Sequence, residues 1–332
     1  MPKPANITAP VGRLAPSPTG AQHIGNARTY LLAWLSIRAR GGRLIVRMED
    51  IDSPRIKLGA AQQALDDLHW LGLDWEEGPD CGGPHAPYVQ TERTELYRAA
   101  LEQLKQAEQI YPCTCTRTDV EAAASAPHVG QEGPRYPGTC AKRTAQDAAL
   151  LQNRPFAWRF RASNKMRLFK DKAQRWQACR VASDLGDFVV GKRDGSPAYQ
   201  LAPAYQLTVV CDDHAMGITE VVRGDDLLPS TFRQLELYAF FGWKPPRFAH
   251  VPLVIGSDGR RLAKRHGDTR LSMLRERRIP PERLLGLLAW SCGLRDSITP
   301  VTAHELLTDF AWNAMPRDPF VFTERMLSDL LA

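Results

Sequence analysis

The segment from Gly12 to Asn26 constrains the fold of this chain more than any other. It reads G-R-L-A-P-S-P-T-G-A-Q-H-I-G-N, so a short apolar stretch passes through a loop rich in proline and glycine into a His-Ile-Gly sequence. The next residues, Ala27 to Arg40, carry apolar side chains at helical spacing and end at two glycines. A helix that begins after such a loop can hold phosphate, because its first N–H groups are unpaired and its dipole attracts anions.

The chain up to Glu108 alternates between strand and helix patterns. Ile7 to Leu14 and Arg43 to Met48 have the composition of strands, whereas Gly59 to Leu71 and Thr91 to Glu108 have helical periodicity. Together with the helix at Ala27 to Arg40, this order predicts an α/β fold with a parallel sheet.

A second group of elements follows after residue 200. Tyr205 to Cys211 is a near-continuous apolar run and predicts a buried strand, and Ile218 to Arg223 predicts another. Ser230 to Phe241 predicts a helix. Val251 to Ile255 and Arg260 to Leu262 flank a Gly-Ser-Asp-Gly turn and predict a hairpin. The C-terminal stretch beyond this point reads as helices punctuated by proline.

Charge and hydropathy favour a cytoplasmic protein with a polyanionic partner. The formal net charge is +6, and the sequence pI is about 9.0. No stretch approaches the roughly 20 apolar residues of a membrane span, and residues 1–10 lack the apolar centre of a signal peptide. We therefore expect no membrane association.

Three of the seven cysteines are clustered. Cys113, Cys115 and Cys140 lie close together in the sequence, in a stretch from 113 to 143 rich in proline and glycine. In a reducing compartment such a cluster favours a metal over disulfides. A metal would also explain how an insert so poor in apolar residues stays folded. Two short strands are expected after it, at Trp158 to Arg161 and Asp187 to Val190. The other four cysteines read as ordinary thiols: Cys81, Cys179, Cys211 and Cys292.

A basic segment follows the predicted hairpin. It reads G-R-R-L-A-K-R-H from Gly259 to His266, which is either a solvated basic turn or a clamp for phosphate. As a clamp, Lys264 would neutralise pyrophosphate leaving the α-phosphorus of ATP. His23, Gly25 and Asn26, at the first helix, would hold the rest of the nucleotide.

These two segments resemble the H-I-G-H and K-M-S-K-S signatures of the class I aminoacyl-tRNA synthetases. They stand here as H-I-G-N, ending at Asn26, and as R-L-A-K-R, with Ala263 in the third position and Lys264 in the fourth. Asn26 retains hydrogen-bonding groups but cannot carry charge, and Ala263 lacks a hydroxyl. The resemblance implies a Rossmann-type parallel sheet that binds ATP with Mg²⁺, and catalytic roles for His23 and Lys264.

Three further stretches look like the glutamate-specific branch of this family. They are R-L-A-P-S-P-T-G from Arg13, R-M-E-D-I-D from Arg47 and V-V-R-G-D-D-L from Val221. Glutamate brings one ammonium and two carboxylates, so its pocket needs a fixed anion and preferably two guanidinium groups. The resemblance implies the following glutamate-binding residues: Arg13, Ser17, Glu49, Arg223 and a tyrosine. The sequence P-A-Y-Q-L occurs twice in tandem, so the tyrosine is either Tyr199 or Tyr205. We favour Tyr205.

The spacing C-x-C…Y-x-x-x-C resembles the zinc site of one subgroup, the glutamyl-Q tRNA(Asp) synthetases. The resemblance implies structural Zn²⁺ held by Cys113, Cys115, Tyr136 and Cys140. From the residues alone, His128 is an equal candidate for the fourth ligand. The sequence continues only from His266 to Ala332 after the basic segment, so we expect a short helical stem-contact segment in place of a large anticodon-binding portion.

We therefore expect four segments. Residues 1–110 and 191–255 would form the halves of the Rossmann catalytic domain, 111–190 the zinc-bearing insertion, and 256–332 the basic loop and helical segment. The resemblance implies a monomer that activates glutamate with ATP and transfers it to queuosine in the anticodon of tRNA(Asp). Two alternatives stay open: a minimal synthetase that charges tRNA(Glu), and a catalytically weak paralogue that binds RNA or zinc.

Overall fold

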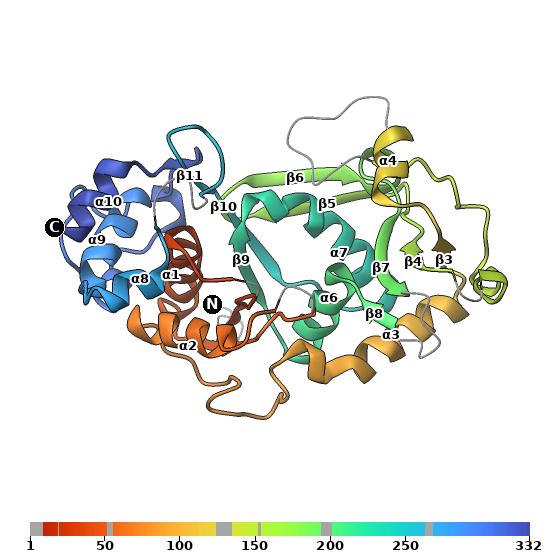
Figure 1. Cartoon of the computed structure of the whole chain (residues 1–332), viewed down its shortest axis with the longest axis horizontal. Coiled ribbons are helices and arrows are strands. Elements are labelled where there is room, and N and C mark those ends of the chain that lie inside the picture. Colours follow the sequence, from red (N-terminus) through yellow and green to blue (C-terminus); the bar gives the residue numbers. More distant parts are fainter. Residues whose placement is uncertain are drawn as a thin grey trace, which may run out of the picture.

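The structure is a computed structural model that describes residues 9–18, 20–51, 56–123, 135–151, 154–193, 201–262 and 268–332. The first helices of the chain lie beside the last ones at one end of an elongated molecule, and the middle of the chain forms the other end (Figure 1). Within the described ranges, every helix is too short or too polar to cross a bilayer.

The N-terminal part follows the predicted alternation of strands and helices. Its elements are β1 (Val11–Leu14), α1 (Ile24–Arg38), β2 (Arg43–Val46), α2 (Ala60–Trp70) and α3 (Thr94–Gln106). β1 and β2 are parallel. Gly12 lets α1 lie directly on β1, because a Cβ at this position would stand 2.4 Å from Cγ1 of Ile37. Residues 7 and 8 of the predicted first strand lie outside the described residues.

A second parallel pair lies beside the first. Its elements are α6 (Tyr205–Ala215), β9 (Glu220–Gly224), α7 (Leu228–Phe241) and β10 (Arg247–Val251). The Thr219 amide before β9 donates a 2.9 Å hydrogen bond to the Val11 carbonyl of β1. The α/β class and the parallel pairing are confirmed. The strands nevertheless pair as two separate two-stranded sheets, so the pairing is not clearly the continuous Rossmann sheet that was expected.

The predicted strand at Tyr205 to Cys211 is wrong, because these residues open helix α6. An apolar run of this length does not distinguish a buried strand from a helix buried on most of its surface. The residues from Leu207 to Asp213 are all buried, between α3, α7 and β7. The run of apolar residues therefore reflects the burial of this helix and does not indicate a strand.

The middle of the chain is antiparallel. Four strands pair in the order β3, β4, β7, β8, and a separate hairpin is formed by β5 and β6. Both predicted short strands are confirmed, as β4 and β7. The bounds are β3 (Ile110–Cys113), α4 (Arg117–Ala123), β4 (Phe156–Phe160), β5 (Met166–Asp171), β6 (Arg175–Arg180), α5 (Val181–Asp184), β7 (Phe188–Arg193) and β8 (Leu201–Pro203). This sheet shares an apolar core with α3, α6 and α7.

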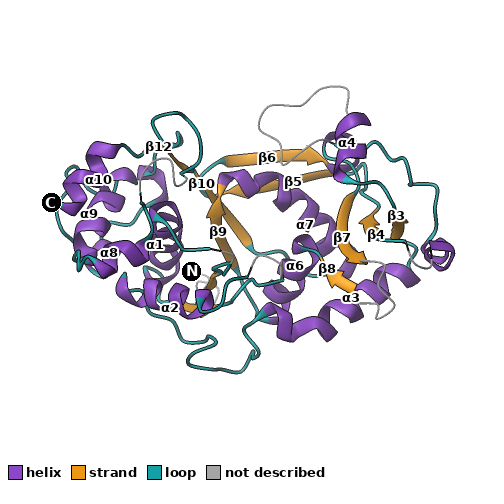
Figure 2. Ribbon diagram, viewed as in Figure 1, coloured by secondary structure: helices purple, strands orange, loops and turns teal. Residues whose placement is uncertain are grey.

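The C-terminal part is mainly helical (Figure 2). Its elements are β11 (Val254–Ile255), α8 (Leu271–Glu276), α9 (Pro281–Ser291), β12 (Phe320–Val321) and α10 (Glu324–Leu331). These helices share one apolar core with α1 and α2. The predicted hairpin is present in minimal form as an Ile255–Arg261 bridge. Short 3₁₀ helices span Gln90–Arg93, Ala145–Leu151, Asp225–Leu227, Glu305–Leu307 and Trp312–Ala314.

Candidate functional site

One cavity of about 180 Å³ lies where the two parallel strand pairs meet the start of α1. Residues from distant parts of the sequence converge on it because β1 and β9 are neighbours. Seven of the residues predicted to bind substrates line its wall: Arg13, His23, Gly25, Asn26, Glu49, Tyr205 and Arg223. The structure thus brings the predicted nucleotide and glutamate residues into one site.

His23 caps the N-terminus of α1 at one side of the cavity. Its Nδ1 accepts a 3.0 Å hydrogen bond from the Gly25 amide. Burial, followed by the nearby positive charge of Arg261, lowers the pKa of His23 to about 4. The imidazole is therefore neutral at pH 7 and, since Nδ1 accepts, carries its hydrogen on Nε2. That N–H can donate to a phosphate or ribose oxygen.

Gly25 and Asn26 complete this helix start. A Cβ on Gly25 would lie 2.9 Å from Cε1 of His23, so the glycine makes room for the capping imidazole. The side-chain Oδ1 of Asn26 accepts a 3.1 Å hydrogen bond from the His23 amide. Asn26 therefore closes a reciprocal cap with His23, and its side-chain NH₂ can still donate to a ligand.

Arg223 stands at the other side of the cavity in a fixed orientation. Its Nη2 donates to Oγ1 of Thr231 at 2.6 Å and to Oε1 of Gln234 at 2.8 Å. Its Nε donates to Nε2 of His250 at 3.2 Å. Nη1 lies 3.3 Å from the hydroxyl of Tyr205. The guanidinium is thus held through Nε and Nη2, and Nη1 remains on the side of the cavity.

His250 and Asp171 continue this chain of hydrogen bonds, and no sequence motif indicated either of them. Nδ1 of His250 lies 2.6 Å from Oδ2 of Asp171, which comes from the end of β5. Burial lowers the pKa of His250 despite the opposing effect of Asp171. A neutral His250 donates from Nδ1 to Asp171 and accepts at Nε2 from Arg223. Asp171 therefore fixes the tautomer that Arg223 requires.

Glu49 is positioned by a buried arginine. Nη2 of Arg47 donates to Oε1 of Glu49 at 2.8 Å, and Nη1 donates to Oδ1 of Asp213 on α6 at 2.8 Å. Arg13 lies beside this group and donates from Nη1 to the Val222 carbonyl at 3.1 Å. The cavity wall also contains Arg261 and Asp226, which pair with each other at 2.8 Å. Arg13, Arg223 and Glu49 supply two further guanidinium groups and one carboxylate, a set that is complementary in charge to glutamate.

The structure does not place every predicted residue at this wall. Ser17 is exposed and does not line the cavity, although its carbonyl accepts a hydrogen bond from Gln22. Lys264, Tyr199 and His128 lie outside the described residues. Tyr205 lines the cavity, and its choice over Tyr199 stays a prediction.

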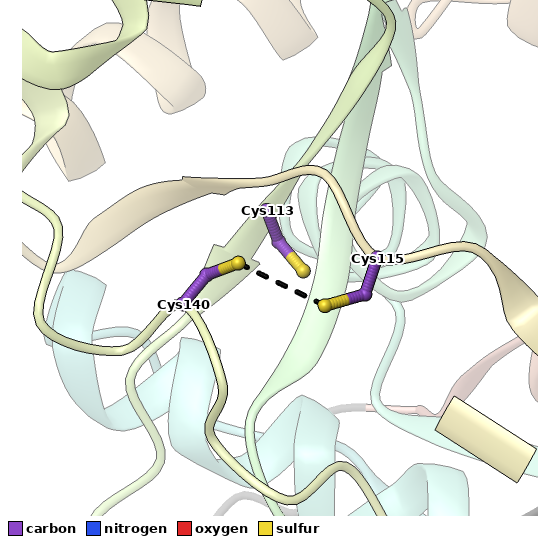
Figure 3. Close-up of side chains that lie close together, drawn as sticks. All are labelled: Cys113, Cys115 and Cys140. Carbon is purple, nitrogen blue, oxygen red and sulfur yellow. Dashed lines mark hydrogen bonds between the residues drawn. The ribbon is translucent and has the colours of Figure 1, made fainter. Parts of the chain in front are cut away.

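The three clustered cysteines come together at the end of β3 (Figure 3). The sulfur atoms of Cys113, Cys115 and Cys140 lie within 4.8 Å of one another. The distance between the Cys115 and Cys140 sulfurs is 3.8 Å, and sulfurs bound at 2.3 Å to a tetrahedral zinc ion also lie about 3.8 Å apart. The Tyr136 hydroxyl lies 3.3 Å from the Cys113 sulfur. The donor set and its spacing fit a metal ion.

The surroundings of Cys140 favour a thiolate. Burial alone would raise the pKa of this thiol, but hydrogen bonds from the backbone at Thr114 and from Tyr136 outweigh it and lower the pKa to about 7. Burial and the neighbouring cysteines instead raise the pKa of Cys115 to about 11. A metal would lower the pKa of all three thiols, since metals bind the deprotonated form.

Comparisons with known proteins identify the family of the chain. The model of the family "tRNA synthetases class I (E and Q), catalytic domain" matches residues 11–329. A glutamyl-Q tRNA(Asp) synthetase of Rhodopirellula baltica is 51% identical over 329 residues, covering 95% of this chain and 97% of that protein. Glutamate–tRNA ligase 2 of Syntrophus aciditrophicus is 40% identical, covering 97% of this chain and 65% of that protein. A glutamate tRNA ligase of Elizabethkingia meningosepticum, solved with its amino acid, has a TM-score of 0.80 and 27% identity, covering 97% of this chain and 68% of that one.

Proposed function

Because the chain belongs to the family of class I tRNA synthetases for glutamate and glutamine, we propose that it activates L-glutamate with ATP and transfers it to queuosine in the anticodon of tRNA(Asp). The observation that carries this proposal is the placement of Arg13, Arg223 and Glu49 around one cavity beside the capped start of α1. The acceptor is proposed from the relative of 51% identity, which is named for it.

In the proposed reaction the residues act by positioning and by charge. Arg13 and Arg223 bind the substrate carboxylates, and Glu49 binds the ammonium, so that one carboxylate oxygen faces the α-phosphorus of ATP. The N–H on Nε2 of His23 donates to the nucleotide. Lys264 is proposed from the sequence to stabilise the departing pyrophosphate. Mg²⁺ supplies further neutralisation of the phosphate charge when bound with ATP. Ser17 stays a proposed residue of the glutamate pocket.

We also propose the finer architecture. The two parallel strand pairs correspond to the halves of a Rossmann-type catalytic domain, at residues 1–110 and 191–255. Residues 111–190 are an insertion that holds structural zinc, and 256–332 are the basic loop and stem-contact helices. The separate small core around the clustered cysteines supports such an insertion. The protein is proposed to act as a monomer.

Transfer of radiolabelled glutamate tests the function. We expect ATP-dependent label on purified tRNA(Asp) that contains queuosine, and no label on tRNA(Asp) that lacks it or on tRNA(Glu). The second candidate, charging of tRNA(Glu), is favoured by the 40% identity to a glutamate–tRNA ligase. Label on tRNA(Glu) alone would establish that function and overturn the proposed acceptor.

Asp171 is expected to act on glutamate binding through His250 and Arg223. In Asp171→Asn, the side-chain amide of the new residue would donate to Nδ1 of His250, so the imidazole hydrogen would move to Nε2. An N–H on Nε2 would then face the N–H of Arg223, and the hydrogen bond between them would be lost. We expect the KM for glutamate to rise about tenfold, since hydrogen bonds to charged groups contribute about 1.5–3 kcal/mol. The KM for ATP should stay within about twofold. Asp184→Asn, an exposed carboxylate on α5, should change neither value. Equal increases in both KM values would contradict this positioning role.

A further inference from the structure

The hairpin of β5 and β6 has an exposed outer face that combines apolar and cationic side chains. Met166, Leu168 and Trp176 are 44%, 62% and 69% exposed, respectively. They are three of the seven large apolar side chains that are exposed among the described residues. In the strand register Trp176 stands opposite Lys170, and Met166 stands opposite Arg180. Side chains alternate along each strand, so all of these share one face.

The inner face of the same hairpin is fixed to the catalytic part. Phe169 packs edge-on against Phe248 of β10, with ring centroids 5.6 Å apart. Nε of Arg167 donates to Glu236 of α7 at 2.7 Å. The hairpin tip is held by the Asp171–His250 contact and by the Lys172 amide, which donates to the Phe248 carbonyl at 3.0 Å. The outer face is therefore presented on a rigid support, along one edge of the molecule (Figure 1).

The charge of the outer face is of one sign. Its six positions contain two cations and no carboxylate: Met166, Leu168, Lys170, Trp176, Ala178 and Arg180. Side chains directly opposite on antiparallel strands have Cβ atoms about 4.5–5.5 Å apart, so the Lys170 ammonium can reach an anion beside the Trp176 ring. An exposed indole next to cations is suited to unpaired nucleic acid, in which flat bases alternate with phosphates.

We propose that this face binds an unpaired segment of the RNA substrate, with one base stacked on Trp176 and the flanking phosphates contacted by Lys170 and Arg180. The inference rests on the proposed function, which supplies an RNA substrate whose anticodon loop contains unpaired bases. A protein partner would need an acidic surface to match Lys170 and Arg180, whereas unpaired RNA supplies both the phosphates for these cations and a flat base for the Trp176 ring.

The test compares variants in binding to queuosine-containing tRNA(Asp), measured by filter binding at several salt concentrations. Trp176→Ala is expected to weaken binding about tenfold or more, and Trp176→Phe to restore most of it because a ring remains. Lys170→Ala should weaken binding and reduce the salt slope by about 0.7, the value for one phosphate contact on a single strand. The matched control is Ile298→Ala, an apolar side chain that is 51% exposed and lies away from the hairpin.

Glutamate-dependent ATP–pyrophosphate exchange without RNA separates this inference from the proposed function. We expect the exchange rate of Trp176→Ala to equal that of the wild type, because Trp176 does not line the cavity. If the wild type transfers glutamate to tRNA but Trp176→Ala binds tRNA as well as Ile298→Ala does, the inference is wrong and the function stands. If the wild type neither transfers glutamate to tRNA nor binds it, both are wrong. Binding to phosphatidylserine vesicles is measured as well. If Trp176→Ala loses binding to these vesicles but keeps its binding to tRNA, the inference is also overturned.

Discussion

Replacing Arg223 with alanine is expected to lower kcat/KM for glutamate about 10²- to 10³-fold in the ATP–pyrophosphate exchange reaction. Arg223 is buried, and its guanidinium is held by Thr231, Gln234 and His250 before substrate arrives. A preorganised, desolvated guanidinium binds a carboxylate more strongly than a mobile surface one. Removing one partner of such a buried charge pair typically costs about 2–5 kcal/mol. The KM for ATP should change less than about twofold.

Two further variants make this result specific. Arg223→Lys keeps the charge but loses the planar fork, so we expect most of the defect to remain. Arg247→Ala removes an exposed arginine from the start of the adjacent strand β10 and should leave the kinetics unchanged. Because Arg223→Ala also removes a hydrogen-bond donor from Nε2 of His250 and from Oε1 of Gln234, its melting temperature must be measured alongside. A folded Arg223→Ala variant with an unchanged KM for glutamate would contradict the assignment of this residue.

The predicted order of elements up to Glu108 was confirmed because local signals there are strong. Gly12 and the glycine pair at 41 and 42 mark close packing and a helix end, and α1 lies between them with its apolar residues buried. The error at Tyr205 to Cys211 arose where burial on most sides removes the periodicity that distinguishes helix from strand. Separate pairing of the parallel strands depends on tertiary packing, which periodicity does not encode.

Most of the predicted site residues could be named from the sequence because they lie in continuous motifs. Seven of them line one cavity. His250 and Asp171 were missed because they belong to different strands, 79 residues apart, and neither lies in a predicted motif. Arg47 was quoted as part of the R-M-E-D-I-D stretch, but the sequence did not indicate that it positions Glu49. Residues that orient other residues through tertiary contacts leave no pattern of their own in a single sequence.

The second large effect is expected at the clustered cysteines. Cys140→Ala should reduce the zinc content from about one ion per chain to near zero, because a structural zinc site needs four ligands. Without the metal, the segment around Tyr136 and Cys140 loses its main support, since few apolar side chains surround it. Arg135 and Lys142 beside it are both exposed. We expect trypsin to cleave there at least about tenfold faster, both in Cys140→Ala and in wild-type protein treated with a chelator.

The controls for the metal site use residues of the same types. Cys81 is exposed and lies outside the cluster, so Cys81→Ala should keep its zinc and its resistance to trypsin. Tyr136→Phe tests the fourth ligand and should speed the release of zinc to a chelator, whereas His128→Ala should not. The opposite pattern would assign the ligand to His128. Among the described residues no cysteine lines the catalytic cavity, so glutamate activation should survive in Cys140→Ala. Full zinc occupancy and unchanged proteolysis in Cys140→Ala would show that the three thiols hold no metal.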